Sequence, residues 1–111
     1  STAITVLSNI TIPSLHLRCP SGVLFDDDGY MYVLEEHNHR IIRSDLNNYR
    51  CLVGCSGMAG SGSDQLDHPS SFSFDSVGNV WVIDRGNSRL QKFVLARNSC
   101  GKHRLIIHSL R

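Results

Sequence analysis

Six histidines and ten acidic residues are the side chains of this sequence that could bind a metal ion or transfer protons. His37 and His39 lie close together in one polar segment. The other histidines are scattered along the chain: His16, His68, His103 and His108. No Cys-x-x-Cys or His-Glu-x-x-His motif accompanies them, so their spacing predicts neither a metal site nor another cofactor.

The acidic run Asp26-Asp27-Asp28 offers oxygen atoms of the kind that bind calcium. The run lacks the spaced ligands of a calcium-binding loop, however, and Gly29 follows it directly. Aspartate side chains satisfy nearby backbone groups in tight turns, and glycine supplies a positive φ. We therefore expect residues 26–29 to form a hairpin turn.

Asp84, Asn87 and Arg89 form the group that most resembles a catalytic site. Asp84 ends one apolar run and Arg89 begins the next, so an ion pair between them would hold two neighbouring strands together. Asn87 would turn the intervening loop. The sequence contains no Gly-x-Ser-x-Gly motif and no phosphate-binding loop. We interpret the group as structural and expect no enzymatic activity.

Four cysteines raise the question of disulfide pairing. On an extended strand the Cα atoms of Cys51 and Cys55 would lie about 13 Å apart, whereas a disulfide needs roughly 4.4–6.8 Å. A turn at Gly54 would bring them together, and we predict a Cys51–Cys55 disulfide in an oxidising compartment. We expect Cys100 to be free or bonded to a segment outside this chain, and the pairing of Cys19 stays open.

Composition and charge exclude several classes of protein. The 111 residues are 41% hydrophobic and 19% charged with a net charge of +1, which is typical of one globular unit and gives no basic field for nucleic acid. No apolar stretch approaches the roughly 18 residues of a membrane span. Asn9-Ile10-Thr11 is an acceptor sequon for N-glycosylation. We therefore expect an extracellular or secreted protein, with a cytoplasmic one as the alternative.

An internal repeat is the strongest signal in the sequence. A shift of 49 residues aligns residues 17–44 with 66–93, and nine of these 28 positions are identical. Average composition predicts about two identities. Asn38 and Arg40 fall on Asn87 and Arg89, and Glu35 falls on Asp84. The first repeat therefore carries the same structural group as the second.

Each repeat contains short apolar runs separated by turn residues, and no segment has helical periodicity. We expect strands at residues 4–7, 22–25, 30–34, 40–43, 51–53, 80–83, 89–94 and 105–107. The predicted core comprises Phe25, Tyr32, Val33, Ile41, Phe74, Trp81, Val82 and Leu90. The fold class is thus all-β: a partial β-propeller with two four-stranded antiparallel blades plus an extra N-terminal strand.

The expected organisation of residues 1–111 is one propeller segment. Residues 1–16 would form the orphan strand and a linker, and residues 17–55 the first blade. Residues 56–65 are a Gly- and Ser-rich connection, and residues 66–108 would form the second blade. Propellers close with about four to eight blades, so we expect a fragment of a larger propeller or an association of copies, three of which would give six blades.

The second repeat resembles the NHL repeat, through the segments Leu-Asp-His-Pro at 66–69, Gly-Asn-Val-Trp-Val at 78–82 and Asn-Ser-Arg-Leu at 87–90. The first repeat matches through Pro20, Gly29 and Asn-His-Arg-Ile at 38–41, but has Glu35-Glu36 where the family has a single Asp. The resemblance implies a non-catalytic scaffold that binds a protein partner. The alternatives are part of a propeller enzyme similar to peptidylglycine amidating lyase, or the propeller of a larger receptor or ubiquitin ligase.

Overall fold

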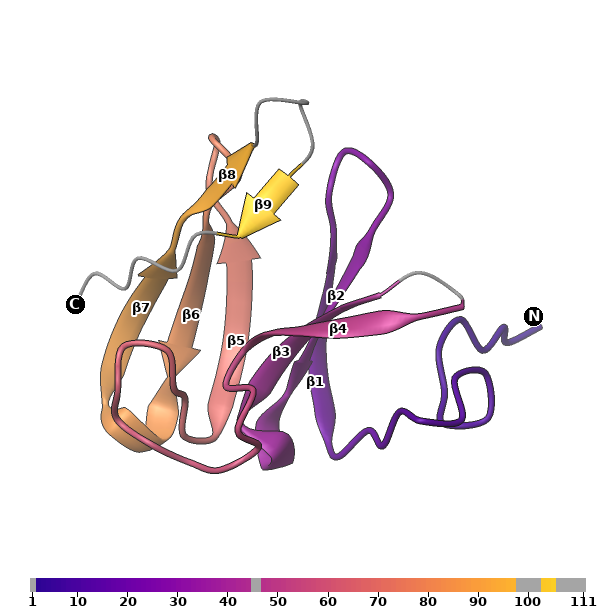
Figure 1. The fold of residues 1–111 in the computed structure, drawn as a ribbon, viewed down its shortest axis with the longest axis horizontal. Helices are drawn as coiled ribbons and strands as arrows, with labels where there is room; N and C mark the ends of the chain where they lie inside the picture. Colours follow the sequence, from indigo (N-terminus) through magenta and orange to yellow (C-terminus); the bar gives the residue numbers. More distant parts are fainter. Residues whose placement is uncertain (1, 45–46, 98–102, 106–111) are drawn as a thin grey trace.

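The computed structural model describes residues 2–44, 47–97 and 103–105. The chain is all-β, as predicted, with two single-turn 3-10 helices, η1 (Glu36–Asn38) and η2 (Arg85–Asn87). The strands, drawn in Figure 1, are β1 (Pro20–Phe25), β2 (Met31–Glu35), β3 (Arg40–Ser44), β4 (Tyr49–Val53), β5 (Pro69–Phe74), β6 (Val80–Asp84), β7 (Arg89–Phe93), β8 (Leu95–Arg97) and β9 (His103–Leu105). No helix within these residues is long and apolar enough to cross a membrane.

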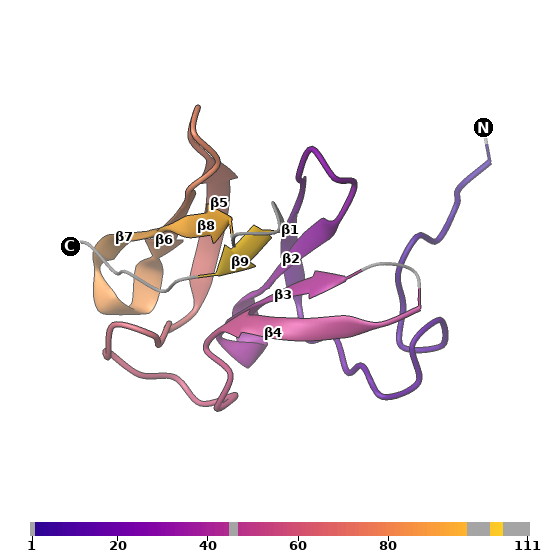
Figure 2. The ribbon, with the colours of Figure 1, turned by 45° about the horizontal axis from the view of Figure 1, so that its top comes forward.

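The strands form two antiparallel meanders that stand side by side as separate blades (Figures 1 and 2). The first blade has the order β1-β2-β3-β4 and the second the order β5-β6-β7. Corresponding strands begin and end 49 residues apart, and β1 and β5 carry a register shift at equivalent places, between Pro20 and Gly22 and between Pro69 and Ser71. The partial propeller predicted from the repeat is therefore confirmed.

The same turn closes the first hairpin of each blade. Asp26 accepts hydrogen bonds from the backbone N–H groups of Asp28 and Tyr30, and Gly29 has a φ of 86°. Asp75 accepts the corresponding bonds in the second blade, where Gly78 has the same φ. Because the aspartate side chain supplies the local acceptor and glycine the positive φ, the acidic run forms a turn.

The main core fills the space between the two blades. Its buried residues come from both sheets and from the connection before β5: Tyr32, Leu34, Ile41, Leu52, Val53, Leu66, Phe72, Val80, Val82 and Phe93. A smaller cluster covers the other face of the first blade, where Ile12 and Leu15 of the N-terminal segment pack against Met31, Val33 and Ile42 of β2 and β3. Every residue of β2 is buried, because this strand is covered on both faces.

Two strand predictions are wrong in detail. Residues 4–7 form no strand, because no neighbouring strand supplies the hydrogen-bonding ladder that an isolated extended segment needs. Within the described residues the second blade has three strands instead of four, since β8 pairs with β9 and not with β7. Of the strand predicted at 105–107, only residue 105 lies inside the described residues, and residue 105 ends β9.

Several expected core residues lie at the surface, for one common reason. Phe25 is 59% exposed and Leu90 is 50% exposed, while Trp81 is half-buried. Blade 1 packs on blade 2 through Tyr32, Leu34 and Ile41. Their equivalents 49 residues later are Trp81, Ile83 and Leu90, which face away from the core on the second blade. The repeat therefore places these side chains correctly, but burial requires a neighbouring blade that the described residues do not include.

Candidate functional site

Asp84 is the centre of a buried polar network at the end of β6. Its side chain is fully buried, and Oδ1 accepts a hydrogen bond of 2.7 Å from the backbone N–H of Asp67. Oδ2 accepts bonds from Asn87 Nδ2 at 2.9 Å and Arg89 Nε at 2.7 Å. Structural donors contact both carboxylate oxygens, so this group fixes the turn between β6 and β7.

Glu35 is the centre of the equivalent network in the first blade. Its Oε1 accepts bonds from the Arg18 backbone N–H at 3.1 Å and from Asn38 Nδ2 at 2.9 Å, and its Oε2 pairs with Arg40 Nε. Glutamate thus makes the contacts that aspartate makes in the second blade, despite its additional methylene group. The next residue, Glu36, faces the second blade instead, where Arg85 Nη2 lies 2.6 Å from its Oε1.

The Cys51–Cys55 disulfide lies at the end of β4. The Cα atoms are 5.6 Å apart, because the chain turns at Gly54 with a φ of 72°. A Cβ atom at Gly54 would lie 2.0 Å from the His39 carbonyl oxygen, so only glycine fits there. The turn foreseen at Gly54 therefore brings the two sulfur atoms together. Cys19 has an exposed free thiol, and Cys100 lies outside the described residues.

Asn9, the sequon residue, is exposed in a turn of the N-terminal segment. Its Oδ1 accepts a hydrogen bond of 2.8 Å from the backbone N–H of Leu17. The bond orients the carboxamide through its oxygen, so the amide nitrogen, which is the atom a glycan would modify, takes no part in it.

Residues from two distant segments of the sequence also meet in the structure. His39, at the end of η1, meets Asp67 and His68, which precede β5. The His68 backbone N–H donates to His39 Nδ1 at 3.0 Å, and Asp67 Oδ1 lies 2.6 Å from His68 Nδ1. Burial and the neighbouring His68 lower the pKa of His39 below its usual value. Sequence spacing could not reveal this group, because its members come from different blades.

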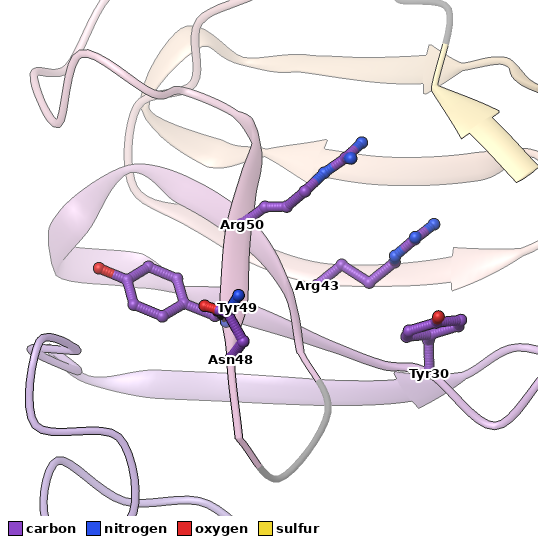
Figure 3. Close-up of a pocket in the computed structure, with 5 residues that line it drawn as sticks. All are labelled: Tyr30, Arg43, Asn48, Tyr49 and Arg50. Atoms are coloured by element: carbon purple, nitrogen blue, oxygen red, sulfur yellow. Dashed lines mark hydrogen bonds between the residues drawn. The ribbon is translucent and has the colours of Figure 1, made fainter.

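A small pocket opens beside β3 and β4 of the first blade (Figure 3). It has a volume of about 140 Å³ and is lined by Tyr30, Arg43, Asn48, Tyr49 and Arg50. Arg43 and Arg50 extend in the same direction in Figure 3, and the Arg43 guanidinium lies 4.4 Å from the centre of the Tyr30 ring. The site is therefore cationic and aromatic.

The two arginines of this pocket are direct cross-strand partners in the β3–β4 pairing. Like charges directly opposite each other destabilise an antiparallel sheet. Within residues 2–44, 47–97 and 103–105 neither arginine forms an ion pair. The arrangement therefore carries a like-charge cost. The Arg43 guanidinium stacks on the Tyr30 ring and interacts with the Tyr32 hydroxyl, but no carboxylate in the described part of the chain neutralises either arginine.

Comparison with known proteins identifies the repeat. The family model described as NHL repeat matches residues 66–93. The chain is 36% identical over 77 residues to NHL repeat-containing protein 3 of Mus musculus, and the alignment covers 67% of this chain and 22% of that protein. The corresponding protein of Homo sapiens is 34% identical over 77 residues, with the same coverage. The chain thus spans about a fifth of the length of these curated relatives. The repeat, the strand-end networks and these similarities together show that the chain belongs to the NHL-repeat β-propeller family.

Proposed function

We propose that the chain is a non-catalytic binding scaffold within an NHL-repeat propeller and that it binds a protein through the pocket of the first blade. The observation that carries the proposal is the Arg43–Arg50 pair, two like charges held opposite each other in the sheet, neither of which forms an ion pair within the described residues. The polar groups at the strand ends are occupied in holding the turns, so they support the scaffold and not a reaction.

The lining of the pocket indicates the chemistry of its partner. Tyrosine and arginine are enriched among the residues that contribute most to protein–protein binding. Tyr30 is 39% exposed, and its ring is covered on one side by the Arg43 guanidinium. Two adjacent guanidinium groups favour carboxylate oxygens, which they can bind in a bidentate manner. We infer that the partner presents an acidic peptide segment.

Charge reversal at the pocket tests this function. A fluorescent glutamate-rich peptide serves as the probe, with a lysine-rich peptide as the negative control, and anisotropy gives the affinity. The double variant Arg43→Glu, Arg50→Glu should weaken binding at least about tenfold, or roughly 1.4 kcal/mol. Lys92→Glu is the matched control, because Lys92 is the residue 49 positions after Arg43. Equal affinity of the double variant and the wild type, or an equal loss in Lys92→Glu, would contradict the proposal.

We further propose an extracellular or secreted location with a glycan on Asn9. The Cys51–Cys55 disulfide supports an oxidising compartment, and Asn9 is exposed in a turn. Expression through the secretory route of animal cells should give a chain whose electrophoretic mobility increases after treatment with an N-glycosidase. Asn9→Gln should remove that shift. A secreted wild-type chain without the shift would refute the glycan.

We also propose that a further blade covers the exposed face of the second blade, as in a six-bladed propeller. Trp81, Ile83 and Leu90 correspond to the blade 1 residues that pack on blade 2. They would therefore pack in the same way on a following blade, in a head-to-tail contact. Light scattering on the isolated chain should show self-association. A stable monomer that unfolds cooperatively at micromolar concentration would contradict this proposal.

A further inference from the structure

Four side chains of metal-binding type gather at the seam between the blades. His37 lies in η1, and His39 is the residue that follows and caps it. Asp67 and His68 lie in the connection just before β5. The rings of His39 and His68 are 4.5 Å apart and nearly perpendicular, and the ring of the exposed His37 is 6.0 Å from that of His68. The group shares no residue with the arginine pocket.

The fold itself does not require these residue types. Both His39 and His68 have a positive φ, at 53° and 47°. The repeat keeps that backbone conformation at the equivalent positions, where Ser88 has a φ of 51° and Cys19 a φ of 52°. Serine and cysteine therefore satisfy the same backbone. The positive φ therefore does not by itself require histidine at position 39 or position 68.

The equivalent positions of the other repeat also lack the remaining two residue types of the group, the histidine at 37 and the aspartate at 67. His37 corresponds to Gly86, and Asp67 corresponds to Arg18. In contrast, the Glu35 and Asp84 networks retain their asparagine and arginine in both repeats. The seam thus holds histidine and aspartate where the equivalent positions of the other repeat have neither, although His39, Asp67 and His68 lie in the segments that resemble the NHL repeat.

The distances suit a metal ion. One ligand atom from each of His39, Asp67 and His68 can be chosen so that all three lie within 4.8 Å of one another. Asp67 Oδ1 lies 3.9 Å from His39 Nδ1 and 2.6 Å from His68 Nδ1. A tetrahedral site with zinc–ligand bonds of roughly 2.0–2.2 Å has ligands about 3.4 Å apart, which falls between these separations. Side-chain shifts of about 1 Å would therefore complete the geometry.

We propose that His39, Asp67 and His68 bind a divalent zinc ion that links the first blade to the second. The ion would take over the lone pair of His39 Nδ1 that now accepts the His68 N–H. For His68 to bind through Nδ1, the proton that it shares with Asp67 would move to Nε2 or to solvent, and the freed carboxylate would offset part of the charge of the ion. Imidazole and carboxylate ligands favour zinc over magnesium, which prefers an all-oxygen octahedron. His37 can rotate from the exposed turn to supply the fourth ligand, or water can do so.

Zinc binding to the purified, tag-free chain tests the proposal, measured by competition with a chromophoric chelator. The variants His39→Asn and His68→Asn remove one imidazole each, and asparagine tolerates the positive φ that both positions require. Asp67→Asn removes the negative ligand with little change of shape. His16→Ala is the matched control, because His16 is an exposed histidine outside the group.

The wild type should bind one equivalent of zinc, and each of the three cluster variants should bind it at least about tenfold more weakly. His16→Ala should retain wild-type affinity, and magnesium chloride should not compete. Zinc should also raise the melting temperature of the wild type, because it binds the folded chain, and should not raise that of His68→Asn. Unchanged zinc affinity in His39→Asn and His68→Asn, or no zinc binding by the wild type at micromolar concentrations, would overturn the site.

Discussion

Glu36 and Arg85 form an ion pair across the seam between the blades, with 2.6 Å between Oε1 and Nη2. The two residues are 49 positions apart, so they occupy the same place in consecutive repeats. A position that is acidic in one repeat and basic in the next can therefore join neighbouring blades. The pair gives a structural role to the second glutamate of the Glu35-Glu36 segment, in which the first blade departs from its family.

The Glu36–Arg85 pair should contribute little to stability, because the Arg85 side chain is 61% exposed. Exposed ion pairs are worth about 0.2–1 kcal/mol and weaken as salt screens them. A double-mutant cycle with Glu36→Ala and Arg85→Ala, measured by urea unfolding, should give a coupling free energy in that range that falls in high salt. A coupling above about 2 kcal/mol would show that solvent does not screen the pair.

Asp84→Asn should be far more damaging, because the carboxylate is fully buried and accepts from three donors. Asparagine keeps the shape but presents an N–H group to donors and leaves Arg89 without its charge partner. Loss of one partner of a buried pair costs about 3–5 kcal/mol. Urea unfolding measures the change, with the exposed Asp64→Asn as a control that should remain within about 0.5 kcal/mol. A loss below about 1 kcal/mol in Asp84→Asn would indicate that water replaces the network.

Reduction of the Cys51–Cys55 disulfide should lower the free energy of unfolding by about 2 kcal/mol or less, because the bond closes a short loop and constrains the unfolded chain only slightly. Urea unfolding of the double variant Cys51→Ala, Cys55→Ala against the wild type measures this loss of free energy, with Cys19→Ser as the control.

The pairing itself can be checked by peptide mass. Trypsin cleaves after Arg50 and Arg85, so both cysteines fall in one peptide. Under oxidising conditions that peptide should be lighter by two hydrogen atoms than its reduced form. A peptide with two free thiols would rule out the bond.

Acid should destabilise the chain through Asp75. The Trp81 indole N–H donates to Asp75 Oδ2 at 3.0 Å and, with the backbone N–H groups of the turn, lowers the pKa of the carboxyl to about 2 from 3.8. A group whose pKa falls on folding stabilises the folded chain above its unfolded pKa. This contribution should therefore be complete above about pH 4 and should disappear as the pH falls towards 2.

Trp81 fluorescence reports that titration directly, because Trp81 is the only tryptophan in the chain. The wild type should show a transition with a midpoint near pH 2, and Asp75→Asn should lack it. Lys92, whose amine lies 5.3 Å from the centre of the indole ring, provides a control variant, Lys92→Met, in which the transition should remain. A transition near pH 4 in the wild type would mean that the hydrogen bond does not persist in solution.

The repeat by itself determined the strand pairing, the hairpin turns and the strand-end networks. Most of these contacts are local: Asp75 acts on residues up to six positions away, and Asp84 pairs with Asn87 and Arg89 within one turn. The Asp67 N–H that completes the Asp84 network is 17 positions away. The turn at Gly54 is equally local, since the bonded cysteines are only four positions apart in sequence. Interactions of this range leave a visible pattern in residue types and spacing.

Tertiary structure alone decided which faces are buried and which distant side chains meet. Phe25 and Phe74 are equivalent in sequence, yet only Phe74 packs against a neighbouring blade, with its ring 5.2 Å from that of Tyr32. His39 and His68 meet because the connection from β4 returns to the start of β5 beside η1. The alternation of a strand shows which residues share a face, but burial depends on what packs against that face, and that is fixed only when the blades are placed in space.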